Sequence, residues 1–142
     1  MDTLLPPIKF VTAPSPEIGR QLSEEILRTA PQNIGGLAIL KIIIDQKGWK
    51  ISRNPTFSAE SKMQALLVPL LRGGFSVVLN TSSLPNSPEE AERQETFLIG
   101  HEIAHSFFYK DAPGTIPHRI GSKQTSQDEE AFCDEFGQAF VT

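Results

Sequence analysis

The length, composition and charge of the chain narrow its class before any motif is considered. With 142 residues, 39% of them hydrophobic and 21% charged, the chain fits a single domain over residues 1–142 and is too apolar for a disordered protein. A net charge of −4 without a basic stripe argues against direct nucleic-acid binding, and no apolar run has the length of a membrane span. The single cysteine, Cys133, cannot form an internal disulfide, so a reducing compartment, the cytoplasm, is expected.

The first part of the chain predicts two helices. Residues 1–15 are rich in proline and are expected to be irregular. The Ser–Pro pair at 15–16 is typical of a helix start, and the apolar stripe behind it continues to about Thr29. The run 37–44 is ambiguous, because its isoleucines favour a strand whereas Gly48 beyond it is a good helix terminator. We expect a helix there.

The middle of the chain predicts a short strand and a hairpin. Residues 49–51 form the short strand, and the β-rich runs 63–68 and 75–79 lie on either side of a Gly-Gly pair. Two such runs around a glycine turn are typical of a β-hairpin. Pro69 would then lie at a strand end or on an edge strand, because proline cannot donate a ladder hydrogen bond.

Two capping boxes in the second part of the chain predict two further helices. Residues 88–142 carry eleven Asp/Glu and four Lys/Arg together with all three histidines, which suits a divalent cation. The stretch 87–90 (Ser-Pro-Glu-Glu) predicts a helix of about 22 residues that ends near Tyr109, followed by a loop over 110–125. Ser126 opens a helix that continues to the C-terminus, with an apolar stripe of Phe132, Phe136 and Phe140.

His101, Glu102 and His105 form an H-E-x-x-H motif inside the first of these two helices. Residues four apart lie one above the other on a helix face, so both imidazoles can bind one ion. The ion lowers the pKa of a coordinated water to around 7, and the glutamate is placed to take its proton and deliver it to a leaving amine. The apolar residues around the motif favour a buried helix whose histidines face a cleft, although a match of this length also arises by chance.

A catalytic zinc site needs a third protein ligand, and four residues are candidates. Asp111 follows His105 at the distance along the chain at which some zinc peptidases place a third ligand. Those peptidases have a glycine that turns the chain, and this sequence has Phe108 at that position, which argues against Asp111. His118 lies on a loop and remains an alternative. Glu129 is at the third position of its capping box, where the carboxylate is expected to reach back to the cap. Glu130 is then free to face the ion and is the favoured third ligand.

Other residues are candidates for supporting roles. Asp134, one turn beyond Glu130, is placed to accept the second N–H of a ligating histidine, although an ordinary acidic helix face explains both carboxylates equally well. His118, followed by Arg119, is a candidate for stabilising an oxyanion across the cleft, with a plain surface loop as the alternative. The strand over 74–80 is a candidate for binding a substrate as an added strand.

The stretch 92–109, which contains the H-E-x-x-H motif, resembles the core of the ImmA/IrrE metallopeptidases. The stretch 129–136 (Glu-Glu-Ala-Phe-Cys-Asp-Glu-Phe) resembles the second signature of that family. The resemblance implies an α+β, zincin-like fold of the gluzincin type, in which a small mixed sheet packs on an HExxH helix and a Glu-bearing helix. Two features differ from the family pattern. Gly100 stands where the family usually has alanine. Relatives also continue beyond the position of Thr142, so the C-terminal part of the family domain is expected to be missing.

Carried over residue by residue, the resemblance implies His101, His105 and Glu130 as ligands of Zn²⁺, and Glu102 as the general base. Such a site also accepts Mn²⁺. The usual substrates of the family are helix-turn-helix repressors or antitoxins cut at one site, so a regulatory protein of this kind is the expected partner. Two alternatives stay open: a non-catalytic metal-binding regulatory or interaction module, and a coincidental motif without a metal.

Overall fold

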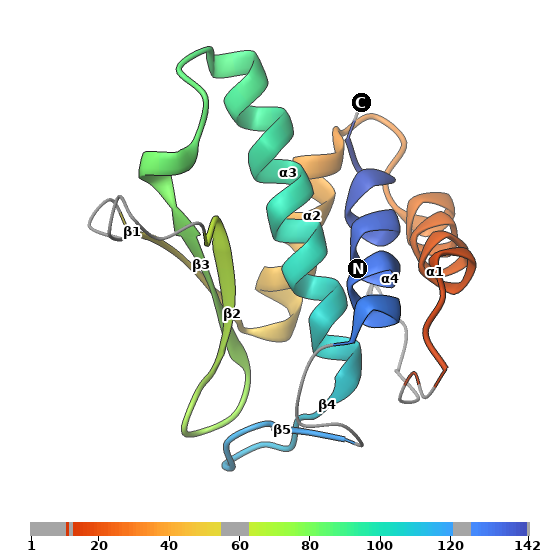
Figure 1. Cartoon of the computed structure of the whole chain (residues 1–142), viewed down its shortest axis with the longest axis vertical. Helices are drawn as coiled ribbons and strands as arrows, with labels where there is room; N and C mark the ends of the chain where they lie inside the picture. The colour runs from red at the N-terminus through yellow and green to blue at the C-terminus, as the bar shows by residue number, and fades with distance from the viewer. Residues whose placement is uncertain (1–10, 12, 55–62, 121–125, 142) are drawn as a thin grey trace.

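The computed structural model describes residues 11, 13–54, 63–120 and 126–141, and the chain is α+β, as predicted (Figure 1). Its helices and strands follow one another in the order α1 (Pro16–Thr29), α2 (Gly36–Lys47), β1 (Lys50–Asn54), β2 (Ala65–Pro69), β3 (Phe75–Asn80), α3 (Pro88–His105), β4 (Tyr109–Lys110), β5 (His118–Arg119) and α4 (Gln127–Gln138). Two 3₁₀ turns, η1 (Thr81–Ser83) and η2 (Ser106–Phe108), follow β3 and α3. The prediction for residues 1–15 falls largely outside the described residues. Within the described ranges, no helix is long and apolar enough to cross a membrane.

The three-stranded sheet is mixed and has the strand order β1-β3-β2. β1 runs parallel to β3, and β2 runs antiparallel to it. The turn between β2 and β3 has positive φ at Gly73 (100°) and Gly74 (75°), a conformation that glycine adopts without steric cost. The predicted hairpin is confirmed, and Pro69 ends an edge strand as expected.

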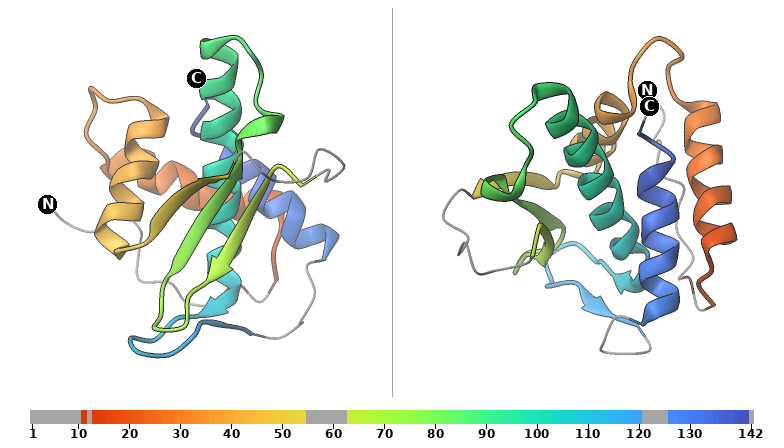
Figure 2. Two further views of the ribbon diagram at one scale, coloured as in Figure 1. Left: turned by 90° about the vertical axis from the view of Figure 1, so that its left-hand side faces the viewer. Right: turned by 45° about the horizontal axis from the view of Figure 1, so that its top comes forward.

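The four helices lie on one side of this sheet (Figures 1 and 2). Alternate side chains of β3 point into the buried core between the sheet and the helices: Phe75, Val77 and Leu79. α3 packs between the sheet and α4, and α1 covers the other side of α4. α3 and α4 touch at the level of their backbones, because a Cβ on Gly100 would lie 2.8 Å from the Cα of Gly137. This close approach brings α4 next to the H-E-x-x-H motif.

The local signals for helix ends were confirmed at three of four places. Ser15 Oγ accepts a hydrogen bond of 3.2 Å from the Ile18 N–H at the start of α1, and Gly48 ends α2 with φ 71°. Ser126 caps α4 with its side chain. Ser87 precedes α3, but its hydroxyl makes no capping hydrogen bond.

The prediction that α3 continues to about Tyr109 was wrong, since the α-helix ends at His105 and a 3₁₀ turn follows. Phe107 and Phe108 pack edge-on against Phe132 of α4, with ring centroids 5.8 and 5.3 Å apart. Tyr109 is extended because β4 pairs with β5. Packing against α4 and pairing in this hairpin therefore end the helix four residues early.

Candidate metal centre

The H-E-x-x-H motif lies at the C-terminal end of α3, where both imidazoles face one point. The Nε2 atoms of His101 and His105 are 3.1 Å apart. Each of these side chains is 12% exposed. The spacing of four residues on a regular helix produces the convergence. One lone pair from each ring can thus be directed to a single ion.

Glu130 of α4 adds a third donor at the same point. Its Oε2 lies 3.1 Å from His101 Nε2, and its Oε1 lies 3.3 Å from His105 Nε2. In a tetrahedral zinc site with bonds of about 2.0–2.1 Å, neighbouring donor atoms lie about 3.3–3.4 Å apart. Two imidazole nitrogens and one carboxylate oxygen are also a donor set of catalytic zinc sites. The three side chains expected as ligands therefore fit a zinc ion in both spacing and chemistry.

Two more carboxylates of α4 lie against the outer nitrogens of the rings. Asp134 Oδ1 is 2.8 Å from His101 Nδ1, and Glu129 Oε2 is 2.7 Å from His105 Nδ1. A carboxylate at Nδ1 favours the tautomer with the proton on Nδ1, which leaves the lone pair of Nε2 for a metal. Asp134 thus lies beside His101 Nδ1, as expected, although without a well-aligned hydrogen bond, and Glu129 lies beside the second histidine and makes one.

The expected orientation of Glu129 was wrong. Its backbone N–H does bind Ser126 Oγ at 3.1 Å, but its carboxylate turns away from the cap. The carboxylate is 4% exposed, accepts hydrogen bonds from both terminal nitrogens of Arg119 and contacts His105. Burial raises the pKa of this carboxyl, but the hydrogen bonds from His105 and Arg119 outweigh burial and lower it. The Glu129 carboxylate therefore binds His105 and Arg119 instead of the backbone N–H at the start of α4.

The pKa values of the two imidazoles shift in opposite directions. Burial and the neighbouring His105 lower the pKa of His101, although Glu130 and Asp134 oppose this shift. Burial also lowers the pKa of His105, but the hydrogen bond to Glu129 and the nearby carboxylates outweigh it, and the pKa is raised. Of the two rings, His105 is therefore the one whose surroundings favour a positive charge.

Glu102 is buried next to the cluster, and its Oε2 lies 3.9 Å from His101 Nε2. Burial raises the pKa of its carboxyl to about 7, while His105 and a hydrogen bond from the backbone of Leu67 oppose the rise. A carboxyl with this pKa can both accept and release a proton near neutral pH. Glu102 thus lies beside the candidate ligands, and burial raises the pKa of its carboxyl to about 7.

A cleft of about 470 Å³ opens over these residues. Its walls come from β2, α3, β4, β5 and α4, and they include Met63, Leu66, Phe97, Tyr109 and Arg119. The cluster of histidines and carboxylates forms the floor, because His101, Glu102, His105 and Glu130 also line the cleft. A substrate in this cleft would lie against the three candidate ligands.

The strand next to the cleft is β2, so the assignment of strand 74–80 as the substrate-binding strand was wrong. β3 lies in the centre of the sheet between β1 and β2, and both of its edges are paired. Asn80 N–H donates to Gln64 O at 2.9 Å and Leu70 N–H donates to Gly74 O at 3.0 Å. The even-numbered residues of β2 therefore bind β3. Ala65 and Leu67 direct their backbone groups to the opposite edge, with which no strand of the described residues pairs.

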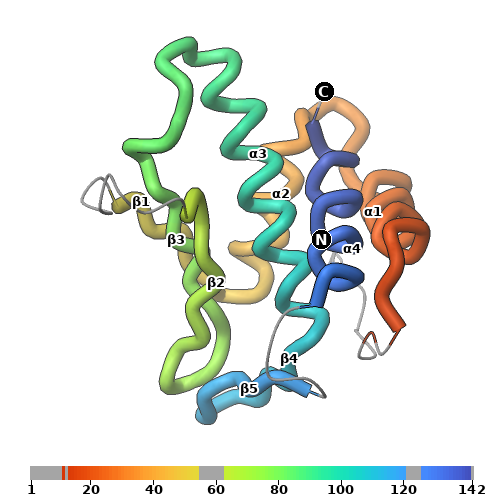
Figure 3. The backbone as a smooth tube through the Cα atoms, in the orientation of Figure 1, coloured from red at the N-terminus to blue at the C-terminus, as the bar shows by residue number. Residues whose placement is uncertain are grey.

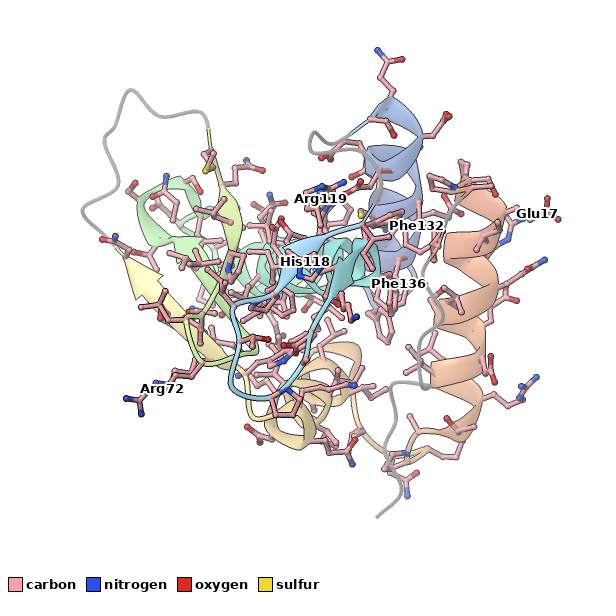
Figure 4. The ribbon with its side chains drawn as sticks, turned by 90° about the horizontal axis from the view of Figure 1, so that it is seen from below. Glu17, Arg72, His118, Arg119, Phe132 and Phe136 are labelled. Carbon is pink, nitrogen blue, oxygen red and sulfur yellow. The ribbon has the colours of Figure 1, made fainter. Side chains whose placement is uncertain are left out.

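The other two loop candidates for the third ligand lie away from the cluster. Asp111 Oδ1 accepts a hydrogen bond of 2.9 Å from Gly74 N–H in the neighbouring hairpin. His118 is exposed and is not among the residues that line the cleft, so its predicted place at the oxyanion is not supported. Successive residues of a strand point to opposite faces, and Figure 4 shows Arg119 extending from β5 toward α4. Of the two residues, Arg119 lines the cleft, and its guanidinium is bound to Glu129.

Comparison of the chain with protein-family models, with curated proteins and with solved structures gives no significant match. The geometry of the cluster and the two sequence motifs therefore carry the argument about function.

Proposed function

We propose that this chain is a zinc-dependent endopeptidase of the gluzincin type, with His101, His105 and Glu130 as the metal ligands. The observation that carries the proposal is the convergence of three side chains from two helices: the two Nε2 atoms lie 3.1 Å apart, and the two oxygens of Glu130 lie 3.1 Å from His101 Nε2 and 3.3 Å from His105 Nε2. Manganese is an alternative ion, because the same nitrogen and oxygen donors bind it.

The proposed chemistry is hydrolysis of a peptide bond in the cleft. When bound, zinc supplies Lewis-acid polarisation of the peptide carbonyl and lowers the pKa of water. Glu102, buried beside the two histidines, takes a proton from the attacking water and passes it to the leaving amine. The carboxylates of Asp134 and Glu129 keep the Nε2 lone pairs of the two histidines directed into the site.

The proposed substrate is a protein segment in an extended conformation. Such a segment would pair with the open edge of β2, where the N–H and C=O of Ala65 and the C=O of Leu67 point outward. The Leu67 backbone lies close enough to Glu102 to lower the pKa of its carboxyl, so a strand added at this edge would lie beside the proposed general base. A helix-turn-helix repressor or an antitoxin, in the cytoplasm, is the substrate class that the resemblance to ImmA/IrrE peptidases implies.

The test combines metal binding with cleavage. The purified chain is stripped with a chelator, titrated with Zn²⁺, and assayed with a library of unstructured peptides. We expect one zinc per chain and cleavage that the chelator abolishes. A chain that binds no zinc contradicts the proposal. A chain that binds zinc and cleaves no peptide, with the same result for Glu102→Gln, would identify a non-catalytic metal-binding module instead.

A further inference from the structure

Arg119 and Glu129 form a buried ion pair at the side of the metal centre. The guanidinium donates from Nη1 to Glu129 Oε2 at 3.1 Å and from Nη2 to Oε1, so both carboxylate oxygens are bound. The side chain of Arg119 is 15% exposed and that of Glu129 is 4% exposed. A two-pronged contact of this kind fixes the plane of the carboxylate as well as its position.

The same carboxylate oxygen connects Arg119 to a candidate metal ligand. Glu129 Oε2 receives the hydrogen bond from Arg119 Nη1 and also lies 2.7 Å from His105 Nδ1. The path from the guanidinium to the His105 ring thus passes through one atom. A rotation of the Glu129 carboxylate would break the contact with Nδ1.

Arg119 is itself held by a hairpin that packs on the sheet. Its guanidinium carbon lies 5.4 Å from the ring centre of Tyr109, and that ring packs edge-on against Phe75 at 5.2 Å. The turn of this hairpin is bound to the tip of the β2–β3 hairpin, because Gly114 N–H donates to Arg72 O at 3.0 Å. Figure 3 shows the two hairpin tips side by side. Arg119 is therefore held from two sides, by Tyr109 of this hairpin and by the Glu129 carboxylate of α4.

We propose that Arg119 is a positioning residue of the metal centre: by holding both oxygens of Glu129, it keeps the His105 ring in the tautomer and orientation that direct Nε2 toward His101 and Glu130. The inference rests on the proposed function, since it assigns a purpose to the pair only if His105 binds a metal. It also explains why α4 carries two consecutive glutamates, because Glu130 supplies a ligand atom and Glu129 orients the neighbouring ligand.

The test measures zinc affinity and the histidine tautomers separately. Zinc affinity is measured by competition with a chelator for the wild type, Arg119→Gln, Arg119→Lys, Glu129→Gln and the double variant Arg119→Gln/Glu129→Gln. Long-range proton–nitrogen NMR of the metal-free proteins, at a pH where both rings are neutral, gives the tautomer of His101 and of His105. Arg20→Gln is the matched control, because Arg20 also pairs with a glutamate of α4, at 3.6 Å and far more exposed.

We expect Arg119→Gln to weaken zinc binding by about tenfold or more and to reduce the Nδ1–H tautomer of His105 while that of His101 is unchanged. Arg119→Lys should restore part of the affinity, because lysine keeps the charge and loses the two-pronged geometry. In the Glu129→Gln background, loss of Arg119 should have no further effect on affinity. The control should bind zinc as the wild type does.

Wild-type zinc affinity and an unchanged His105 tautomer in Arg119→Gln would overturn the inference, as would losses that multiply in the double variant. If Arg119→Gln does not fold, the same two measurements on Arg119→Lys decide the question. A wild-type chain that binds no zinc, but whose His105 tautomer still depends on Arg119, would support the positioning contact and refute the peptidase proposal.

Discussion

His101 and His105 direct the same atom to the same point, yet the surroundings of the two rings differ. The carboxylate behind His101 belongs to Asp134, which is 60% exposed, whereas the carboxylate behind His105 belongs to Glu129, which is 4% exposed. Glu129 makes a well-aligned hydrogen bond with its ring. Asp134 is equally near its ring, but the Nδ1 of His101 has no well-aligned hydrogen bond among the described residues.

This difference shows how solvent access changes the value of a similar contact. An exposed pair of charges is screened by water and contributes little, whereas removing one partner of a buried pair leaves an uncompensated charge and costs several kcal/mol. We therefore regard the His105 half of the site as rigidly held and the His101 half as adaptable.

The largest effect is expected from Glu102→Gln, which leaves both rings and both supporting carboxylates in place. If the two halves serve metal binding and Glu102 serves proton transfer, kcat for peptide cleavage should fall by about 10²–10⁴-fold. Zinc content should stay at the wild-type level. Retained cleavage, or loss of zinc, would show that Glu102 has been given the wrong role.

The comparison itself is tested by Glu129→Gln against Asp134→Asn, since each change removes one charge and keeps the shape. Loss of a carboxylate behind a metal-binding histidine typically costs about 10–100-fold in metal affinity. We expect Glu129→Gln to reach the upper part of this range and Asp134→Asn the lower part, in a chelator-competition assay. Equal losses would contradict the distinction between a rigid and an adaptable half.

The contact between α3 and α4 is tested by Gly137→Ala. The added Cβ would lie 2.7 Å from the Phe97 carbonyl oxygen and 2.9 Å from the backbone nitrogen of His101, so the helices must separate. We expect a loss of about 1–2 kcal/mol in the free energy of unfolding, measured with denaturant, because overpacking exceeds the gain in helix propensity. Gly35→Ala is the comparison, since its added Cβ meets nothing within 4 Å and only the smaller loss from a poorer helix cap is expected there. A stabilised Gly137→Ala variant would refute the backbone-level contact.

The smallest effect is expected from Arg20→Gln, which removes an exposed ion pair between α1 and α4. Arg20 and Glu135 are 3.6 Å apart, and their side chains are 52% and 40% exposed. The free energy of unfolding should change by less than about 0.5 kcal/mol in the same denaturant experiment. A clearly larger loss would mean that exposed pairs on α4 matter more than the comparison assumes.

The sequence alone predicted the parts of this protein that depend on neighbouring residues. Local hydrogen bonds and spacings, within a few positions of the chain, explain three such features. These are the helix starts at Ser15 and Ser126, the hairpin around Gly73, and the convergence of His101 and His105. These features could be read because each depends on local geometry.

Only the tertiary structure decided which groups from distant segments meet. Glu129 lies 24 residues from His105 and ten from Arg119, so its turn away from its own helix cap depends on packing that no local pattern encodes. The edge position of β2 likewise depends on the pairing of β1 with β3 across the sheet. Side-chain orientation in the site was therefore set by burial between elements, where an unpaired charge costs far more than at a helix end.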